Sequence, residues 1–173
     1  MYAGSAAGGV WKTTNGGGNW NAKSDYLAGL GVTDIIIDPN NPSILYMATG
    51  DEDASHISSI GLYKSTDAGD TWLPTGLTFA LSDNEYIRDI AFAPGNSSKI
   101  FALTNSFIVV SSDSGATWGQ ATTGATLAES YQNIIFDPND ANKVVVSSLN
   151  ALKCTVELLK DNWNTVKWKT WWM

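Results

Sequence analysis

The stretch Ser65–Trp72, which reads Ser-Thr-Asp-Ala-Gly-Asp-Thr-Trp, occurs in four versions along the chain. Ser111–Trp118 has the same Ser, Asp, Gly, Thr and Trp at the same offsets, and Thr13–Trp20 is a looser version. A fourth version at Leu159–Val166 keeps only Asp161 and Thr165. The aligned Asp or Asn positions are separated by 52, 46 and 48 residues, a spacing that indicates repeated structural units.

The motif has a mechanical interpretation as a tight turn that leads into a strand. A short carboxylate such as Asp67 accepts hydrogen bonds from backbone N–H groups ahead of it, and Gly69 adopts a left-handed conformation without steric cost. Thr71 and Trp72 favour a strand, and Trp72 is large enough to be buried between neighbouring units. The motif residues are Thr13, Asn15, Gly17 and Trp20; Ser65, Asp67, Gly69, Thr71 and Trp72; Ser111, Asp113, Gly115, Thr117 and Trp118; and Asp161.

This pattern resembles the Asp box, or bacterial neuraminidase repeat, of β-propeller proteins. The resemblance implies an all-β fold of about four four-stranded antiparallel blades, as a partial arc of a seven- or eight-bladed propeller. In that family the box is a structural turn, present in enzymes, receptors and assembly factors alike. It therefore predicts the fold and not the function.

A wider likeness covers roughly residues 2 to 148. Tyr2–Thr14, Asp38–Tyr46 and Gly61–Trp72 look like segments of xyloglucanase, sortilin and photosystem-assembly-factor propellers. They look most like large exported Bacteroidetes proteins that carry type IX secretion sorting domains. The resemblance implies a secreted or cell-surface protein.

Composition narrows the partners. The chain has 173 residues, is 43% hydrophobic and carries a net charge of −7 with one arginine, Arg88, which argues against nucleic acid binding. A lone Cys154 in an apolar run rules out a disulfide framework within one chain. No apolar run is long enough to span a membrane, and the first 30 residues lack a secretory leader, so we expect an exported parent protein to carry its leader elsewhere.

The repeats divide the chain into a partial blade at 1–28, blades at 29–79 and 84–124, and a divergent blade at 129–173. We expect three strands in the first segment, four in each of the others and no helix. The strands expected in the second blade are Val32–Pro39, Ile44–Gly50, Gly61–Thr66 and Thr71–Gly76. Pro- and Asn-rich turns that begin at Asp38, Ala93 and Asp137 join the first and second strands of their blades.

The second blade is about nine residues longer than the third, and the extra length falls in Gly50–Ile60. In a four-stranded meander this loop lies at the opposite end from the Asp-box turns, on the face where propellers mostly bind ligands. The loop carries Asp51, Glu52, Asp53 and His56, which is the only histidine. These residues are candidates for a ligand site, a catalytic carboxylate or a calcium site; no recognised metal-ligand spacing is present, and a solvated acidic loop is the alternative.

Three functional classes compete. A sialidase is disfavoured because it would need three arginines to hold the substrate carboxylate. A xyloglucanase-like inverting glycoside hydrolase remains open, since that family places one catalytic aspartate soon after a second strand, where Asp51 lies. Its partner carboxylate comes from a second propeller, so we expect this chain alone to be inactive. We favour a binding or scaffold module for a polysaccharide or protein ligand, with no cofactor.

The closing region differs from the repeats. Trp163, Trp168, Trp171 and Trp172 lie in the last eleven residues and suit either sugar stacking or packing between blades, of which packing is favoured. The first segment lacks its innermost strand, so we expect a blade face to remain uncovered, with Trp20 among the exposed groups. The predicted partner is the remainder of a longer propeller or a second copy of the chain, and a closed four-bladed monomer is the competing outcome.

Overall fold

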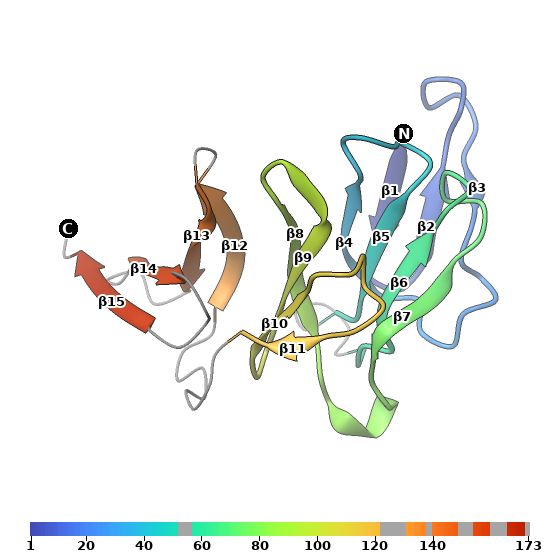
Figure 1. Cartoon of the computed structure of the whole chain (residues 1–173). Helices are drawn as coiled ribbons and strands as arrows, with labels where there is room; N and C mark the ends of the chain where they lie inside the picture. The colour runs from blue at the N-terminus through green and yellow to red at the C-terminus, as the bar shows by residue number, and fades with distance from the viewer. Residues whose placement is uncertain (52–56, 122–130, 138–139, 149–153, 160–165, 172–173) are drawn as a thin grey trace. The chain divides into compact units, whose positions relative to one another are not determined.

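The computed structural model describes residues 1–51, 57–121, 131–137, 140–148, 154–159 and 166–171 (Figure 1). In this part of the chain it contains fifteen strands and one short 3₁₀ turn, so the predicted all-β fold class is confirmed. The chain divides into two compact units, residues 1–88 and 89–173, which we describe separately.

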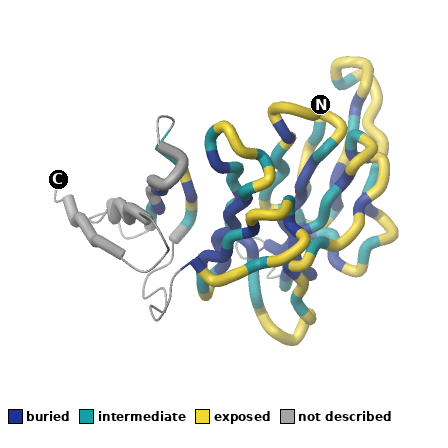
Figure 2. The backbone as a smooth tube through the Cα atoms, in the orientation of Figure 1, coloured by how far each residue is buried: buried dark blue, intermediate teal, exposed yellow. Residues whose placement is uncertain are grey.

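The first unit contains two antiparallel sheets with strands in chain order. The three-stranded sheet, called the first sheet below, is formed by β1 (Tyr2–Ser5), β2 (Gly9–Lys12) and β3 (Asn21–Ala22). The four-stranded second sheet is formed by β4 (Val32–Ile37), β5 (Leu45–Thr49), β6 (Gly61–Ser65) and β7 (Leu73–Thr78). All five residues of β5 are buried, so this strand forms the centre of the unit (Figure 2).

The register of the first sheet separates its two faces. Gly4 pairs with Val10 on one face and Ala3 pairs with Trp11 on the other, because successive side chains of a strand point to opposite sides. Val10 is fully buried and belongs to a core cluster with Leu45, Met47 and Trp72 of the second sheet and its turn. The face that bears Val10 therefore packs against the second sheet.

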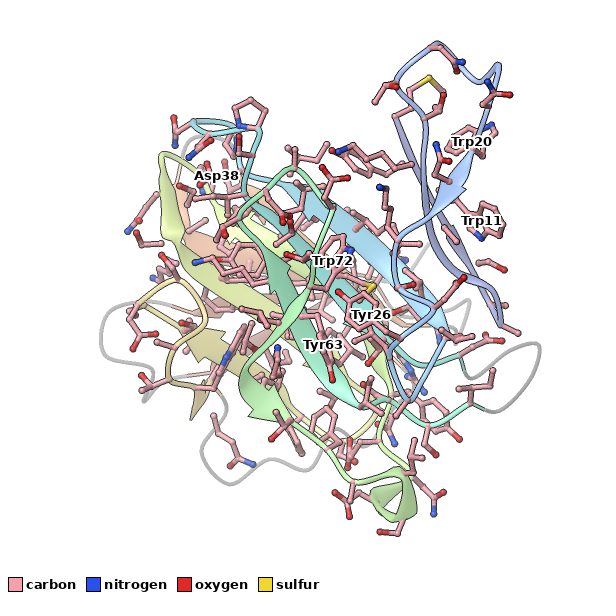
Figure 3. All side chains as sticks on the ribbon, turned by 90° about the vertical axis from the view of Figure 1, so that its right-hand side faces the viewer. Trp11, Trp20, Tyr26, Asp38, Tyr63 and Trp72 are labelled. Atoms are coloured by element: carbon pink, nitrogen blue, oxygen red, sulfur yellow. The ribbon has the colours of Figure 1, made fainter. Side chains whose placement is uncertain are left out.

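Trp72 is the largest side chain in this interface and is 1% exposed (Figure 3). Its backbone N–H donates to the Tyr26 hydroxyl at 2.6 Å, and the Tyr2 hydroxyl donates to the Ala68 carbonyl at 2.7 Å. Asp70 pairs with Lys23 at 2.9 Å and Lys12 at 3.2 Å. Hydrogen bonds from Lys23 and then Lys12 lower the pKa of Asp70, so the turn before β7 is tied to the first sheet by both polar and apolar contacts.

The Ser65–Trp72 turn is closed by its own side chains. Ser65 Oγ donates to Asp67 Oδ1 at 2.8 Å and accepts from Gly69 N–H at 2.8 Å, while Asp67 Oδ1 accepts from Thr71 N–H at 2.9 Å. Gly69 is left-handed at φ +79°, and so is Ala68 at φ +58°, which the pattern did not predict. Two consecutive left-handed residues reverse the chain within the motif.

The other two turns reproduce this geometry. Ser111 Oγ donates to Asp113 Oδ1 at 2.7 Å, and Thr117 N–H donates to the same oxygen at 2.8 Å. In the first turn Thr13 Oγ1 pairs with Asn15 Oδ1 at 2.9 Å. Asp161 lies outside the described residues.

The second unit includes most of a sheet formed by β8 (Ile87–Ala93), β9 (Asn96–Thr104), β10 (Ile108–Ser111) and β11 (Gly119–Gln120). It also contains the pair β12 (Tyr131–Asp137) and β13 (Asp140–Ser148) and the pair β14 (Cys154–Leu159) and β15 (Val166–Trp171). Phe101 packs edge-on against Phe136 with ring centroids 5.0 Å apart in a buried cluster with Ile134 and Val144.

Two details differ from the expected strand pattern, and the blade boundaries remain a prediction. Among the described residues the last segment forms two two-stranded sheets where one four-stranded blade was expected at 129–173, and the repeat pattern on which that expectation rested weakens after residue 148. The 3₁₀ turn η1 (Leu81–Asp83) was also not expected. It forms because Asp83 Oδ2 accepts the Ala80 N–H at 2.9 Å.

The turn carboxylates predict how stability depends on pH. Hydrogen bonds from the Thr117 side chain, Thr117 N–H and Ser111 lower the pKa of Asp113 to about 2, and similar bonds hold the pKa of Asp67 well below its usual range. A carboxyl whose pKa is lowered by folding contributes stability above its unfolded pKa of about 3.9, and this contribution is lost as pH falls through the folded pKa. We expect Asp113→Asn to lower the unfolding temperature at pH 7. Between pH 4 and pH 2 the unfolding temperature of this variant should fall less than that of the wild type. Thermal unfolding across this range measures both, and Asp25→Asn, at an exposed aspartate outside the repeated turns, is the control. Identical pH profiles for wild type and Asp113→Asn would contradict the assigned role.

Candidate functional site

The candidate loop begins where β5 ends. Asp51 forms an isolated bridge with Ile57, in which each backbone N–H donates to the other residue's carbonyl at 2.8 Å. The Asp51 residue is 8% exposed, so its position is set by the backbone and by close packing. Glu52, Asp53 and His56, the other candidates, lie outside the described residues.

A buried hydroxyl network holds the base of this loop. Thr49 Oγ1 donates to the Gly61 carbonyl at 2.6 Å, accepts from Ile60 N–H at 3.0 Å and lies 3.0 Å from Ser59 Oγ. Ser59 Oγ accepts from Gly61 N–H at 2.9 Å. Thr49 is 1% and Ser59 0% exposed, so these bonds are shielded from water and keep the two ends of the loop together.

Several chain segments converge beside Asp51. Gly50 N–H donates to the Gly31 carbonyl at 3.0 Å, and Ser59 N–H donates to the Glu85 carbonyl at 2.8 Å. A Cβ on Gly31 would lie 2.9 Å from the Gly50 carbonyl carbon, so only glycine fits this approach. We call this group of largely buried residues, Gly31, Gly50, Asp51, Ile57–Ser59 and Glu85, the Asp51 rim.

The Asp51 rim and the Asp67 turn lie at opposite ends of the second sheet. β5 pairs Leu45 with Ser65, beside the turn, and Ala48 with Leu62, towards the loop. At the turn end Ala68 N–H donates to the Ser43 carbonyl at 2.9 Å. This bond joins the turn between β6 and β7 to the turn between β4 and β5. The repeated motif therefore builds one end of the sheet, and the inserted loop occupies the other.

Glu85 is a rim residue that the sequence analysis missed. One of its carboxylate oxygens is buried, and its backbone holds Ser59. It lies in the connection between β7 and β8, which carries no repeat signal, and the contact with Ser59 spans residues distant in sequence. In the described part of the chain, no three His, Cys, Asp or Glu side chains come together as metal ligands. The described residues also contain no helix with the length and hydropathy needed to cross a membrane.

Sequence comparison relates the chain to xyloglucanases. A xyloglucanase from Paenibacillus sp is 29% identical over 134 residues, which is 70% of this chain and 13% of that protein. Xyloglucanase Xgh74A from Acetivibrio thermocellus is 27% identical over 154 residues, 80% of this chain and 18% of that protein. The chain thus spans less than a fifth of the curated relatives it matches. No family model matches the sequence.

Solved structures identify the fold. The chain superposes on the GH74 enzyme of Niastella koreensis with a TM-score of 0.72 at 21% identity, covering 96% of this chain and 27% of that one. For the GH74 xyloglucanase from Xanthomonas campestris the TM-score is 0.69 at 18% identity, and the match covers 96% of this chain and 28% of that one. For YCF48 bound to D1 peptide the TM-score is 0.57 at 15% identity, and the match covers 79% of this chain and 38% of that one. With its four-stranded antiparallel sheets, the chain has the fold of part of a β-propeller and is similar in sequence to glycoside hydrolases of the xyloglucanase kind.

The hydroxyl network predicts the stability of the rim. Thr49→Val keeps the shape of the side chain but leaves Ile60 N–H without this acceptor, so we expect the free energy of unfolding to fall by about 1–3 kcal/mol. Thr78→Val, at an exposed position of β7, should change it by less than about 0.5 kcal/mol. Chemical denaturation of both variants measures the difference, and equal effects would show that the network does not hold the loop.

Proposed function

We propose that the chain is the polysaccharide-binding part of a glycoside-hydrolase propeller that acts on xyloglucan or a related β-glucan. In this proposal Asp51 is one of the two catalytic carboxylates of an inverting hydrolase, and the chain is not catalytic on its own. The observation that supports it most is the position of Asp51 just after β5, in a chain of which 70–80% is similar to two xyloglucanases.

The local geometry suits a fixed carboxylate. The backbone N–H and carbonyl of Asp51 both hydrogen-bond to Ile57, and Thr49 and Ser59 hold the base of the loop. Little reorganisation of the backbone is therefore needed when a substrate binds. Catalytic side chains on a rigid scaffold hold their geometry better than those on a mobile loop. The repeated turns at the far end of the sheet contribute to the scaffold and not to the chemistry.

The proposed reaction needs a second carboxylate. Inverting hydrolysis uses a general acid on one side of the glycosidic bond and a general base that activates water on the other, with the two carboxyl groups about 6.5–9.5 Å apart. Asp51 supplies one of these groups, and a further propeller of the longer protein supplies the other. Because a polysaccharide is too large to enter a cell intact, the protein would act outside the cell, which agrees with the expected export.

A second candidate is a scaffold that binds a protein segment. The observation that favours it is the likeness to a propeller solved with a bound peptide. In this case the rim would bind an extended peptide and Asp51 would contact its backbone or a basic side chain.

Calorimetric titration of the chain with a xyloglucan heptasaccharide tests the proposal. We expect binding, no release of reducing ends from xyloglucan by the chain alone, and a roughly tenfold loss of affinity in Asp51→Ala, as expected for one lost charged hydrogen bond. Asp67→Asn, at the opposite end of the sheet, should bind as the wild type does, and a maltoheptaose titration controls for non-specific binding. Xyloglucan affinity unchanged in Asp51→Ala would remove Asp51 from the site. Absence of xyloglucan binding together with peptide binding would favour the scaffold.

A further inference from the structure

Two partly exposed tryptophans donate their indole N–H to the carbonyl of a glycine that lies three residues earlier in the chain. Trp118 Nε1–H donates to the Gly115 carbonyl at 3.0 Å, and Trp11 Nε1–H donates to the Gly8 carbonyl at 2.8 Å. Trp118 closes the repeated turn at Ser111–Trp118. In this turn the indole donor is therefore satisfied locally, without help from another sheet.

Trp72 has the same glycine in the same motif but not the same bond. Gly69 precedes Trp72 by three residues, as Gly115 precedes Trp118. Trp72 is 1% exposed, and its buried Nε1–H donates to no group in the described part of the chain. Buried donors without an acceptor are uncommon and unfavourable in folded proteins, so this N–H requires a physical explanation.

The packing of the ring explains why the bond is not made. Trp72 is buried against Val10 of the first sheet and against Leu45 and Met47 of its own sheet, and Figure 3 shows it beside Tyr63. A Cβ built on Gly69 would lie 3.5 Å from Trp72 Cζ2, so the indole borders its own turn while its N–H misses the turn's carbonyl. Only a short movement of the ring separates this packing from the arrangement of Trp118.

We propose that Trp72 is a conformational switch with two positions. In the docked position, which the structure shows, the ring is buried against Val10. In the turn-bonded position the ring withdraws from Val10, and Nε1–H donates to the Gly69 carbonyl as Trp118 donates to Gly115. The docked position is the major one, because burial of an aromatic ring outweighs one neutral hydrogen bond. This inference does not depend on the proposed function.

The polar contacts between the turn and the first sheet do not involve the ring. Asp70 pairs with Lys12 and Lys23, and the Tyr2 hydroxyl donates to the Ala68 carbonyl. These bonds can persist in both positions, so the turn stays tied to the first sheet while the apolar part of the interface opens. Because a large ring must leave and re-enter a close-packed core, we expect exchange in microseconds to milliseconds, with about 1–10% of molecules turn-bonded.

Relaxation-dispersion NMR of the tryptophan indole N–H groups in the intact chain tests the proposal without any substitution. The Trp72 signal is identified by its contacts with the Val10 methyl groups. We expect dispersion at the Trp72 indole and at Val10 with one common exchange rate, because both report the same movement. The Trp118 indole is the internal control and should show none, since its bond to Gly115 is already made. A flat profile at the Trp72 indole would overturn the proposal.

Val10→Ala provides a second measurement. This truncation removes contacts that only the docked ring makes, so we expect the dispersion amplitude at the Trp72 indole to rise at least about threefold. Val146→Ala, the same truncation in the buried cluster of the second unit, is the matched control and should leave it unchanged. An equal effect of the two variants would contradict a movement of the ring away from Val10. A nuclear Overhauser effect from water to the Trp72 indole, without dispersion, would also overturn the proposal and identify water as the acceptor.

Discussion

The burial of Trp72 between two sheets is the interaction on which the rest of the first unit depends. The ring contacts Val10, Leu45 and Met47, and its backbone is held by Tyr26. The preceding turn positions the ring. Hydrogen bonds from the Ser65 hydroxyl and the Thr71 N–H to the Asp67 carboxylate fix the conformation of the chain just before Trp72 and β7. Displacement of Trp72 would therefore open the interface between the two sheets.

The second sheet carries the repeated turn at one end and the inserted loop at the other. The repeated turns hold one end, and they lower the pKa of their own carboxylates through local hydrogen bonds. The inserted loop at the other end is held by Thr49 and Ser59, and the equivalent Thr104 likewise bonds the loop that follows β9. Asp51 lies there beside Ile57, next to the contacts of Gly50 with Gly31 and of Ser59 with Glu85. A propeller can therefore carry different activities on the loop end while keeping the same turns.

Local pattern accounts for most of the fold. The expected strand Ile44–Gly50 contains β5, since alternation and turn residues depend on neighbours in sequence. The left-handed Ala68 and the η1 turn were missed, because side-chain bonds to the backbone overcome ordinary residue preferences there. In the site, the position of Asp51 after a strand was predictable, but its partner Ile57, the buried Ser59 and the contact with Glu85 were not, because they depend on long-range pairing.

Hydrogen exchange with a bound xyloglucan heptasaccharide tests the central claim most directly, because it locates the ligand without any substitution. If the inserted loop binds and the repeated turns only support it, backbone exchange will slow in residues 45–61 and remain unchanged in 111–118. Unchanged exchange in 45–61, with protection instead in 9–22 around Trp11 and Trp20, would contradict the account.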